Sequence, residues 1–213
     1  MDRERTLALR ELLASTGWVD RTRSFAKSLR RSRVGRTPGG LLLVGTPTAE
    51  PWHLTAHLDD EARWFDLPEL TPTLVRWSPP PDAPAHLGVG LPRLENAERG
   101  ETVLVVAPDD PTAPLLERVA DARRSGAVVL AVDAGDTELE DLAHESLVVP
   151  PDSDQSLVTA APEDVPPLSF DVVTHLVSVA AGEPIDEPGS RGLRARLARF
   201  LDSVAGADSG PPR

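Results

Sequence analysis

Residues 102–150 read TVLVVAPDDPTAPLLERVADARRSGAVVLAVDAGDTELEDLAHESLVVP, and this stretch decides the fold. Its apolar runs at 102–107, 127–132 and 146–149 are typical of parallel strands that are buried on both faces. After the first run we predict a helix over 111–125, with Asp110 as N-cap, Pro111 as its first residue and Gly126 beyond its end. Asp136 is predicted to cap a second, short helix.

The same alternation of strands and helices begins earlier in the chain. Further strands are predicted at 41–45 and 73–77, and the helix between them carries an apolar face of Trp52, Leu54, Leu58, Ala62 and Phe65. Another helix is predicted from Ser169 to Ala181. The predicted fold class is therefore α/β: a three-layer αβα, doubly wound, mostly parallel five-stranded sheet with added N- and C-terminal helices.

The charge pattern divides the chain into three predicted parts. Residues 1–40 carry ten Lys/Arg against four Asp/Glu and are predicted to form a basic helical arm, with Asp20 as the N-cap of its second helix. Residues 41–182 form the α/β domain. Residues 183–213 are predicted to hold a linker, an amphipathic helix over 193–204 and a disordered tail.

Composition excludes several classes of chemistry. The absence of cysteine removes disulfides, cysteine metal sites and thiol catalysis, and Lys27 is the only lysine available for Schiff-base chemistry. A net charge of -12 argues against general affinity for nucleic acid or anionic membranes. Because no run is apolar enough to span a membrane and residues 1–10 are charged, we expect a cytoplasmic protein with no membrane association.

Ligands of doubly wound sheets bind beyond the carboxyl ends of the strands, at the point where the strand order reverses. This rule directs attention to the loops at 45–48, 107–112 and 133–137. The candidate ligand-binding residues there are Gly45, Thr46, Thr48, Asp109, Asp110, Thr112 and Asp133. No cofactor is predicted.

Two sets of side chains suggest metal binding, and each has a simpler structural explanation. The first set recurs every four residues on one predicted helix and consists of His53, His57 and Glu61. A solvated polar face opposite the core explains this spacing better. The second set offers the hard oxygen ligands of Asp109, Asp110 and Asp133. Helix capping and turn formation explain it at least as well, and no metal site is predicted.

On these features the segment 41–182 resembles the sugar isomerase (SIS) domain family, which has a flavodoxin-like fold. The family's helix pattern T-x-x-L-L-x-x-x-x-x-A-x-x-x-G is matched by Thr112, Leu115, Leu116, Ala122 and Gly126. Its following short helix and strand end are matched by Leu139, Leu142, Ala143 and Pro150.

The resemblance implies a phosphosugar site with two phosphate-binding turns. The first turn, of Gly-x-Gly-x-Ser type in the family, reads GTPT at 45–48 here. The second, of Ser-x-Ser-Gly-x-Thr type, reads APDDPT at 107–112 and keeps only Thr112. Because Asp109 and Asp110 add negative charge and Pro111 lacks an N–H, we expect phosphosugar binding to be weakened or lost. No catalytic residue is carried over from the isomerases.

The predicted function is that of a divergent, non-catalytic SIS-like protein. It binds a sugar-derived or nucleotide-like small ligand, or it acts as a regulatory or interaction module. The alternative is a phosphosugar isomerase that uses Thr46, Thr48 and Thr112 to bind phosphate.

Self-association is also predicted, as a homodimer, because SIS-like domains commonly pair and because the apolar stripe of the helix at 193–204 needs a partner surface. The arm's positive charge has three readings: pairing within the chain or with a second subunit, a protein partner, and, least favoured, nucleic acid. The residues concerned are Arg21, Arg23, Lys27, Arg30, Arg31, Arg33 and Arg36.

Overall fold

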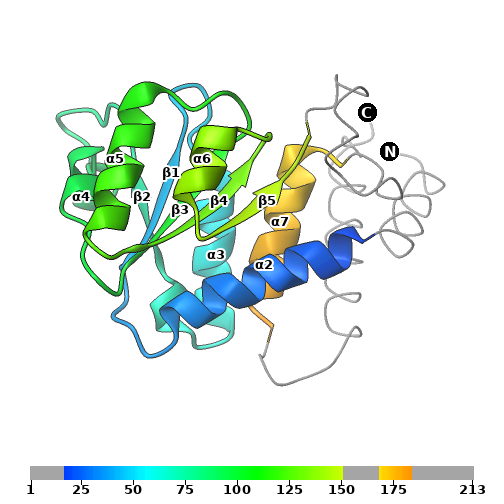
Figure 1. Cartoon of the computed structure of the whole chain (residues 1–213). Coiled ribbons are helices and arrows are strands. Elements are labelled where there is room, and N and C mark those ends of the chain that lie inside the picture. The colour runs from blue at the N-terminus through cyan, green and yellow to red at the C-terminus, as the bar shows by residue number, and fades with distance from the viewer. Residues whose placement is uncertain (1–16, 151–167, 184–213) are drawn as a thin grey trace, which may run out of the picture.

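The computed structural model of the chain describes residues 17–150 and 168–183 (Figure 1). The first predicted helix of the arm and the predicted helix over 193–204 lie outside these residues. Within the described ranges, no helix is both long and apolar enough to cross a membrane.

Five strands form one sheet in the order β2-β1-β3-β4-β5, and every neighbouring pair is parallel. The strands are β1 (Leu41–Gly45), β2 (Pro72–Val75), β3 (Thr102–Ala107), β4 (Val128–Asp133) and β5 (Glu145–Val148). The predicted doubly wound α/β class is thus confirmed, with a sheet that is wholly parallel. Strand β2 ends two residues earlier than predicted, because the N–H of Arg76 leaves the sheet ladder and donates to the carbonyl of Val89.

Helices cover both faces of the sheet (Figure 1). They are α2 (Trp18–Arg33), α3 (Trp52–Trp64), α4 (Pro92–Glu95), α5 (Ala113–Arg124), α6 (Thr137–Leu142) and α7 (Phe170–Ala181), with 3-10 turns at Pro68–Leu70 and Ala85–Leu87. The chain steps from β1 to β2 in one direction and from β2 through β3 and β4 to β5 in the other. Because such crossovers are right-handed, α3 lies on one face and α4, α5 and α6 lie on the other.

Successive strand residues point to opposite faces, which gives two apolar cores. Leu41 and Leu43 of β1 belong to the core shared with α2, α3 and α7. Leu42 and Val44 belong to the core shared with α4, α5 and α6. All five residues of β1 and all six of β3 are buried, so the sheet needs helices on both sides.

Helix α2 is the second predicted helix of the basic arm, and it packs into the same core as the sheet. Trp18, Phe25 and Leu29 are each at most 1% exposed, in contact with the cluster that contains α7. The helix begins at Trp18 after Gly17, so Asp20 lies in its first turn and the predicted N-cap is wrong. With its indole buried in the core, Trp18 is part of the helix, so the helix starts before Asp20.

Helix α5 begins two residues later than predicted. Its N-cap is Thr112, whose extended backbone carbonyl accepts the N–H groups of Leu115 and Leu116 at 2.9 and 3.1 Å. The prediction that Asp110 caps this helix is therefore wrong, because Pro114 rather than Pro111 occupies the first turn. The predicted cap of α6 is confirmed, since the N–H of Leu139 donates to the Asp136 carboxylate at 2.8 Å.

A buried arginine at the end of α2 joins the loops at the amino edge of the sheet. The Arg33 guanidinium donates to the carbonyls of Gly40 at 3.1 Å, Gly100 at 2.9 Å, Glu69 at 3.1 Å and Thr37 at 2.5 Å. Arg33 is 1% exposed. These carbonyls belong to the segments that enter β1, β2 and β3, so one side chain positions the starts of three strands.

Three other basic residues of α2 also make contacts within the chain. Arg30 donates to the carbonyl of Ala181 at the end of α7 at 3.1 Å, and Arg21 donates to Val148 in β5 at 3.0 Å. Arg23 lies 3.6 Å from the carboxylate of Glu183. Lys27 and Arg31 of α2 stay exposed, and so does Arg36 in the loop that follows the helix.

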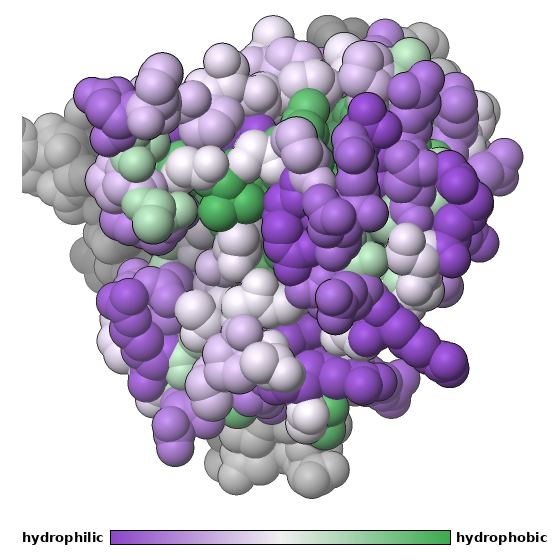
Figure 2. Space-filling model, turned by 90° about the vertical axis from the view of Figure 1, so that its left-hand side faces the viewer, coloured by the Kyte–Doolittle hydropathy of each residue, from purple (hydrophilic) through white to green (hydrophobic). Residues whose placement is uncertain are grey.

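The side of the molecule formed by β2 and α4 is mostly hydrophilic, with small and separate apolar spots (Figure 2). Strand β2 is an edge of the sheet, and unpaired edges promote association with other strands. The short strand and its polar surroundings therefore offer little surface for strand addition.

Replacing Arg33 by alanine should lower the free energy of unfolding by about 3 kcal/mol or more, because several carbonyls lose a shared charged donor in a buried site. Urea unfolding followed by tryptophan fluorescence measures this loss. Arg31→Ala is the matched control, since Arg31 lies on the same helix and is exposed, and it should stay within about 0.5 kcal/mol of the unmodified protein. Equal losses for the two variants would contradict the assigned role of Arg33.

Candidate functional site

The strand order reverses between β1 and β3. The chain leaves β1 toward β2 and returns to β3 on the opposite side of β1. In doubly wound sheets this arrangement separates the loops at the carboxyl ends of the two central strands and leaves a crevice where ligands bind. The candidate site therefore involves the loops that follow Gly45 and Ala107.

The turn after β1 folds back onto its own glycine. A Cβ at Gly45 would lie 2.0 Å from the carbonyl oxygen of Ala49, so only glycine fits there. The Thr46 side chain is buried, and its Oγ1 lies 3.3 Å from Oγ1 of Thr48. The chain itself thus covers the backbone that a phosphate would approach in a phosphate-binding turn.

A side-chain hydrogen bond joins the two loops across the crevice. The Thr48 hydroxyl donates to the Asp109 carboxylate, 61 residues away in sequence. Asp110 is exposed beside it, and the Thr112 Oγ1 is buried without a hydrogen-bond partner among the described residues. The Thr48 donor therefore serves a carboxylate, and a negative charge lies where a phosphate would need hydrogen-bond donors.

Asp133 ends β4 as a fully buried carboxyl group. Its Oδ1 accepts the N–H groups of Gly135 at 2.7 Å and Asp136 at 3.2 Å, and its Oδ2 has no partner in the described part of the chain. Burial raises the pKa of Asp133 to about 6, although the two backbone donors favour the charged form. Its visible role is to fold the turn that leads into α6.

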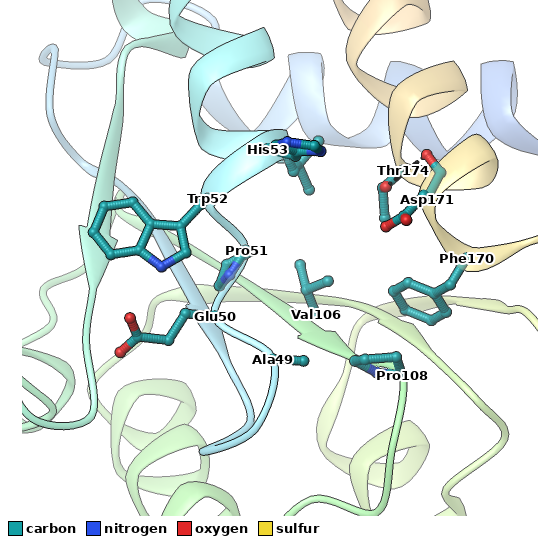
Figure 3. Close-up of a pocket in the computed structure, with 11 residues that line it drawn as sticks. Ala49, Glu50, Pro51, Trp52, His53, Val106, Pro108, Phe170, Asp171 and Thr174 are labelled. Atoms are coloured by element: carbon teal, nitrogen blue, oxygen red, sulfur yellow. Dashed lines mark hydrogen bonds between the residues drawn. The ribbon is translucent and has the colours of Figure 1, made fainter. Parts of the chain in front are cut away.

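An open cleft of about 210 Å³ lies on the α3 and α7 side of the crevice (Figure 3). It is bounded by the loop before α3, by the end of β3 and by the first turn of α7. The lining residues are Ala49, Glu50, Pro51, Trp52, His53, Leu54, Val106, Pro108, Phe170, Asp171 and Thr174. None of the seven sequence-predicted site residues lines this cleft, but Thr48 and Asp109 adjoin it in sequence through Ala49 and Pro108.

The polar groups of the cleft come from the starts of two helices. Asp171 and Thr174 project from the first turn of α7, and His53 faces them from α3 (Figure 3). The Thr174 hydroxyl donates to the backbone carbonyl of Asp171 at 3.0 Å and keeps its capacity to accept. At the start of α3 the N–H of Trp52 donates to the carbonyl of Glu50 at 2.9 Å, and no side chain caps the helix, so its next N–H groups have no partner within the helix. The cleft can both donate and accept hydrogen bonds.

The wall of the cleft toward β2 is fixed by an ion pair. The Glu50 carboxylate accepts from Arg76 Nε at 3.1 Å and from the N–H of Trp77 at 2.9 Å. The Arg76 guanidinium stacks 4.8 Å from the ring centre of Trp52, and Trp77 Nε1 donates to the Gly45 carbonyl at 2.8 Å. Because its charge and hydrogen bonds are satisfied, Glu50 acts in holding the loop in place.

The set His53, His57 and Glu61 does not form the solvated face that its spacing suggested. His57 packs its ring 4.5 Å from that of His175 on α7, and Glu61 is 4% exposed. Burial, together with the nearby His53, lowers the pKa of His57. The correction arises because α7 docks along this face of α3. Among the described residues, no group of three or more His, Asp or Glu side chains could hold a metal ion.

Sequence reasoning missed the contribution of α7. Phe170, Asp171 and Thr174 lie at the start of a helix that was predicted from its apolar spacing, yet nothing in that pattern places it at the β1/β3 crevice. Pro51, directly before the first residue of α3, was a usable signal in the sequence, because proline favours positions at the start of a helix.

Comparison with solved structures shows that this chain shares its fold with proteins that have been described as sugar-binding proteins or phosphosugar isomerases. An inferred sugar-binding protein from Salmonella typhimurium LT2 aligns over 95% of this chain and 54% of its own, with 15% identity and a TM-score of 0.56. An inferred phosphosugar isomerase from Silicibacter pomeroyi DSS-3 aligns over 95% and 53%, with 16% identity and a TM-score of 0.52. The resemblance to the SIS family is thus confirmed at the level of the fold, and this chain spans about half the length of these proteins.

No protein-family model matches the sequence. No curated protein matches it either.

The raised pKa of Asp133 predicts a pH-dependent stability. Between about pH 4 and pH 6 the native state keeps a proton on Asp133 that the unfolded chain has released, so stability falls as pH rises through this window. Asp133→Asn cannot ionise, and the unmodified protein should lose about 2 kcal/mol relative to it between pH 4 and pH 7. Urea titrations at several pH values measure the difference.

Asp110→Asn is the control for this experiment, because Asp110 is exposed at the same edge of the sheet. It removes one carboxylate from the same edge without removing a buried group. A difference for Asp133→Asn that does not vary with pH would contradict the raised pKa of Asp133.

Proposed function

We propose that this chain is a non-catalytic SIS-like module that binds a small, sugar-derived ligand in the cleft between the starts of α3 and α7. The observation that carries the proposal is the position of the cleft, at the carboxyl edge of the sheet beside the β1/β3 reversal. The fold shared with the inferred sugar-binding protein supports the same class of ligand.

The chemistry of the lining fits a polyhydroxylated molecule. Phe170 and Val106 supply an apolar wall against which the C–H face of a sugar ring can pack. Thr174 and Asp171 supply acceptors, and the start of α3 supplies donors. Sugar hydroxyls donate and accept at once, so they use both kinds of group.

The alternative of a phosphosugar isomerase has less support from the geometry. Thr46 is buried, and the Thr48 hydroxyl is already bound to Asp109. Oγ1 of Thr112, at the start of α5, has no hydrogen-bond partner in the part of the chain that the structure describes, and this feature supports the alternative. Glu50, a carboxylate of the cleft, is occupied by Arg76 and does not offer itself as a general base.

Removing the apolar wall should weaken sugar binding. Phe170→Ala should raise the dissociation constant about tenfold, because one aromatic contact contributes on the order of 1 kcal/mol. Calorimetric titration with glucose, mannose, galactose and their amino and 6-phosphate derivatives measures the effect. Trp64→Ala is the matched control: Trp64 is 72% exposed at the far end of α3 and should not affect binding. Absence of binding to the unmodified protein would contradict the proposal.

The same panel tests the alternative. We expect no aldose–ketose interconversion of the 6-phosphates when the mixture is followed by NMR. Turnover that disappears in both Thr48→Ala and Thr112→Val, but persists in Phe170→Ala, would establish the isomerase reading instead.

Self-association remains a prediction, as does a partner for the exposed basic residues of α2. The exposed indole of Trp64 and the ring of Phe65, which is 40% exposed, supply apolar surface on the helical layer. Sedimentation of the full chain at micromolar concentration should show a dimer. A dimer that dissociates at about 0.5 M salt would indicate charge pairing, whereas an apolar contact would persist. A monomer at low salt would reject the prediction.

A further inference from the structure

The charges around the cleft indicate which sugar derivatives it accepts. We infer that the cleft selects a sugar that carries a protonated amine and discriminates against a sugar phosphate. This inference rests on the proposed function, because it concerns the ligand of the same cleft.

The described residues that line the cleft include no lysine or arginine. Their titratable side chains are Glu50, His53 and Asp171. Because Glu50 is neutralised by Arg76 and bonded to the N–H of Trp77, the Asp171 carboxylate is the anionic group left for a ligand. A site that held a phosphate dianion would instead need fixed cations or several convergent donors.

Asp171 is available to a ligand on geometric grounds. Its side chain is exposed, and no hydrogen bond or ion pair within the described ranges engages its carboxylate. In Figure 3 it projects from α7 toward the gap beside Thr174 and above Phe170. Two neighbouring acceptors, the Asp171 carboxylate and the Thr174 hydroxyl, suit the three donors of an ammonium group.

The rim of the cleft strengthens this preference. Pro108 lines the cleft and is followed in the chain by Asp109 and Asp110, both of which are exposed. The hydrogen bond from Thr48 satisfies one oxygen of Asp109 but leaves its negative charge in place. A dianion entering from this side meets repulsion from carboxylates, whereas a cation is attracted.

The starts of α3 and α7 act in the opposite direction, since a helix N-terminus carries about half a positive charge. At α7 this charge is offset by Asp171 in the first turn. Helix α3 has no acidic residue in its first turn, but the N–H of Trp52 already donates to the carbonyl of Glu50 at 2.9 Å. The full charges of the carboxylates outweigh the partial charges of the helix ends, so the cleft as a whole favours a cation.

Affinities for matched ligands test the inference. Glucose, mannose and galactose are each compared with the 2-amino, N-acetylated 2-amino and 6-phosphate derivatives by calorimetric titration of the full chain at pH 7 and low salt. At least one amino sugar should bind about three- to tenfold more tightly than its parent sugar. The gain is modest because an ion pair between an amine and a solvent-exposed carboxylate adds little to the binding free energy. N-acetylation removes the charge and should remove the gain, and the 6-phosphate should bind more weakly than the parent.

Variants assign the preference to one carboxylate. Asp171→Asn keeps the shape of the side chain and removes its charge, so the ratio of amino to parent affinity should fall close to one, and the ratio rather than the affinity for the parent sugar is the quantity that tests the inference. Glu117→Gln removes a matched exposed carboxylate on α5, at the opposite face of the sheet, and should keep the ratio. Raising the salt should reduce the ratio in the unmodified protein and leave it unchanged in Asp171→Asn.

The outcomes separate the two proposals. Equal affinity for parent and amino sugars, tighter binding of a 6-phosphate, or a ratio that survives Asp171→Asn would overturn the inference and leave the proposed sugar-binding function standing. If no sugar of any charge binds, the proposed function fails and the inference fails with it.

Discussion

The structure depends on one constraint, which is that a parallel sheet with apolar residues on both faces must be covered on both faces. Right-handed crossovers place α4, α5 and α6 on one side but supply only α3 to the other. Helices α2 and α7 complete the cover of that second side. The need to bury the sheet therefore brings the start of α7 to the β1/β3 crevice, and the candidate cleft is a consequence of that packing.

The same packing decides how the polar side chains are used. The side chains of Arg30 and Arg33 point from α2 into the fold. Each donates to backbone carbonyls, because a buried guanidinium must be paired. Much of the positive charge of the arm thus serves the fold. Among the described residues near the crevice, the exposed carboxylates are those of Asp109, Asp110 and Asp171. This distribution separates the chain from the phosphate-binding pattern that the family resemblance implied.

The crevice has two sides with different chemistry. Between the two loops, the Thr48–Asp109 hydrogen bond fills the place where the resemblance implied phosphate contacts. On the α3 and α7 side, Phe170, Asp171 and Thr174 form an open cleft with apolar and acceptor groups. The crevice at the strand reversal therefore carries side chains that differ from those of the phosphate-binding turns that the resemblance implied.

Local patterns in the sequence predicted the α/β class, four strands to within a residue, and the cap of α6 by Asp136, because apolar runs and capping residues act over a few positions. They also singled out the loops at the crevice and the replacement of phosphate-turn residues by Asp109 and Asp110. Long-range packing sets three other features: Thr112 caps α5, His57 lies against α7, and α7 contributes Asp171 to the cleft. These features depend on which distant segments pack together, and no local pattern encodes that choice.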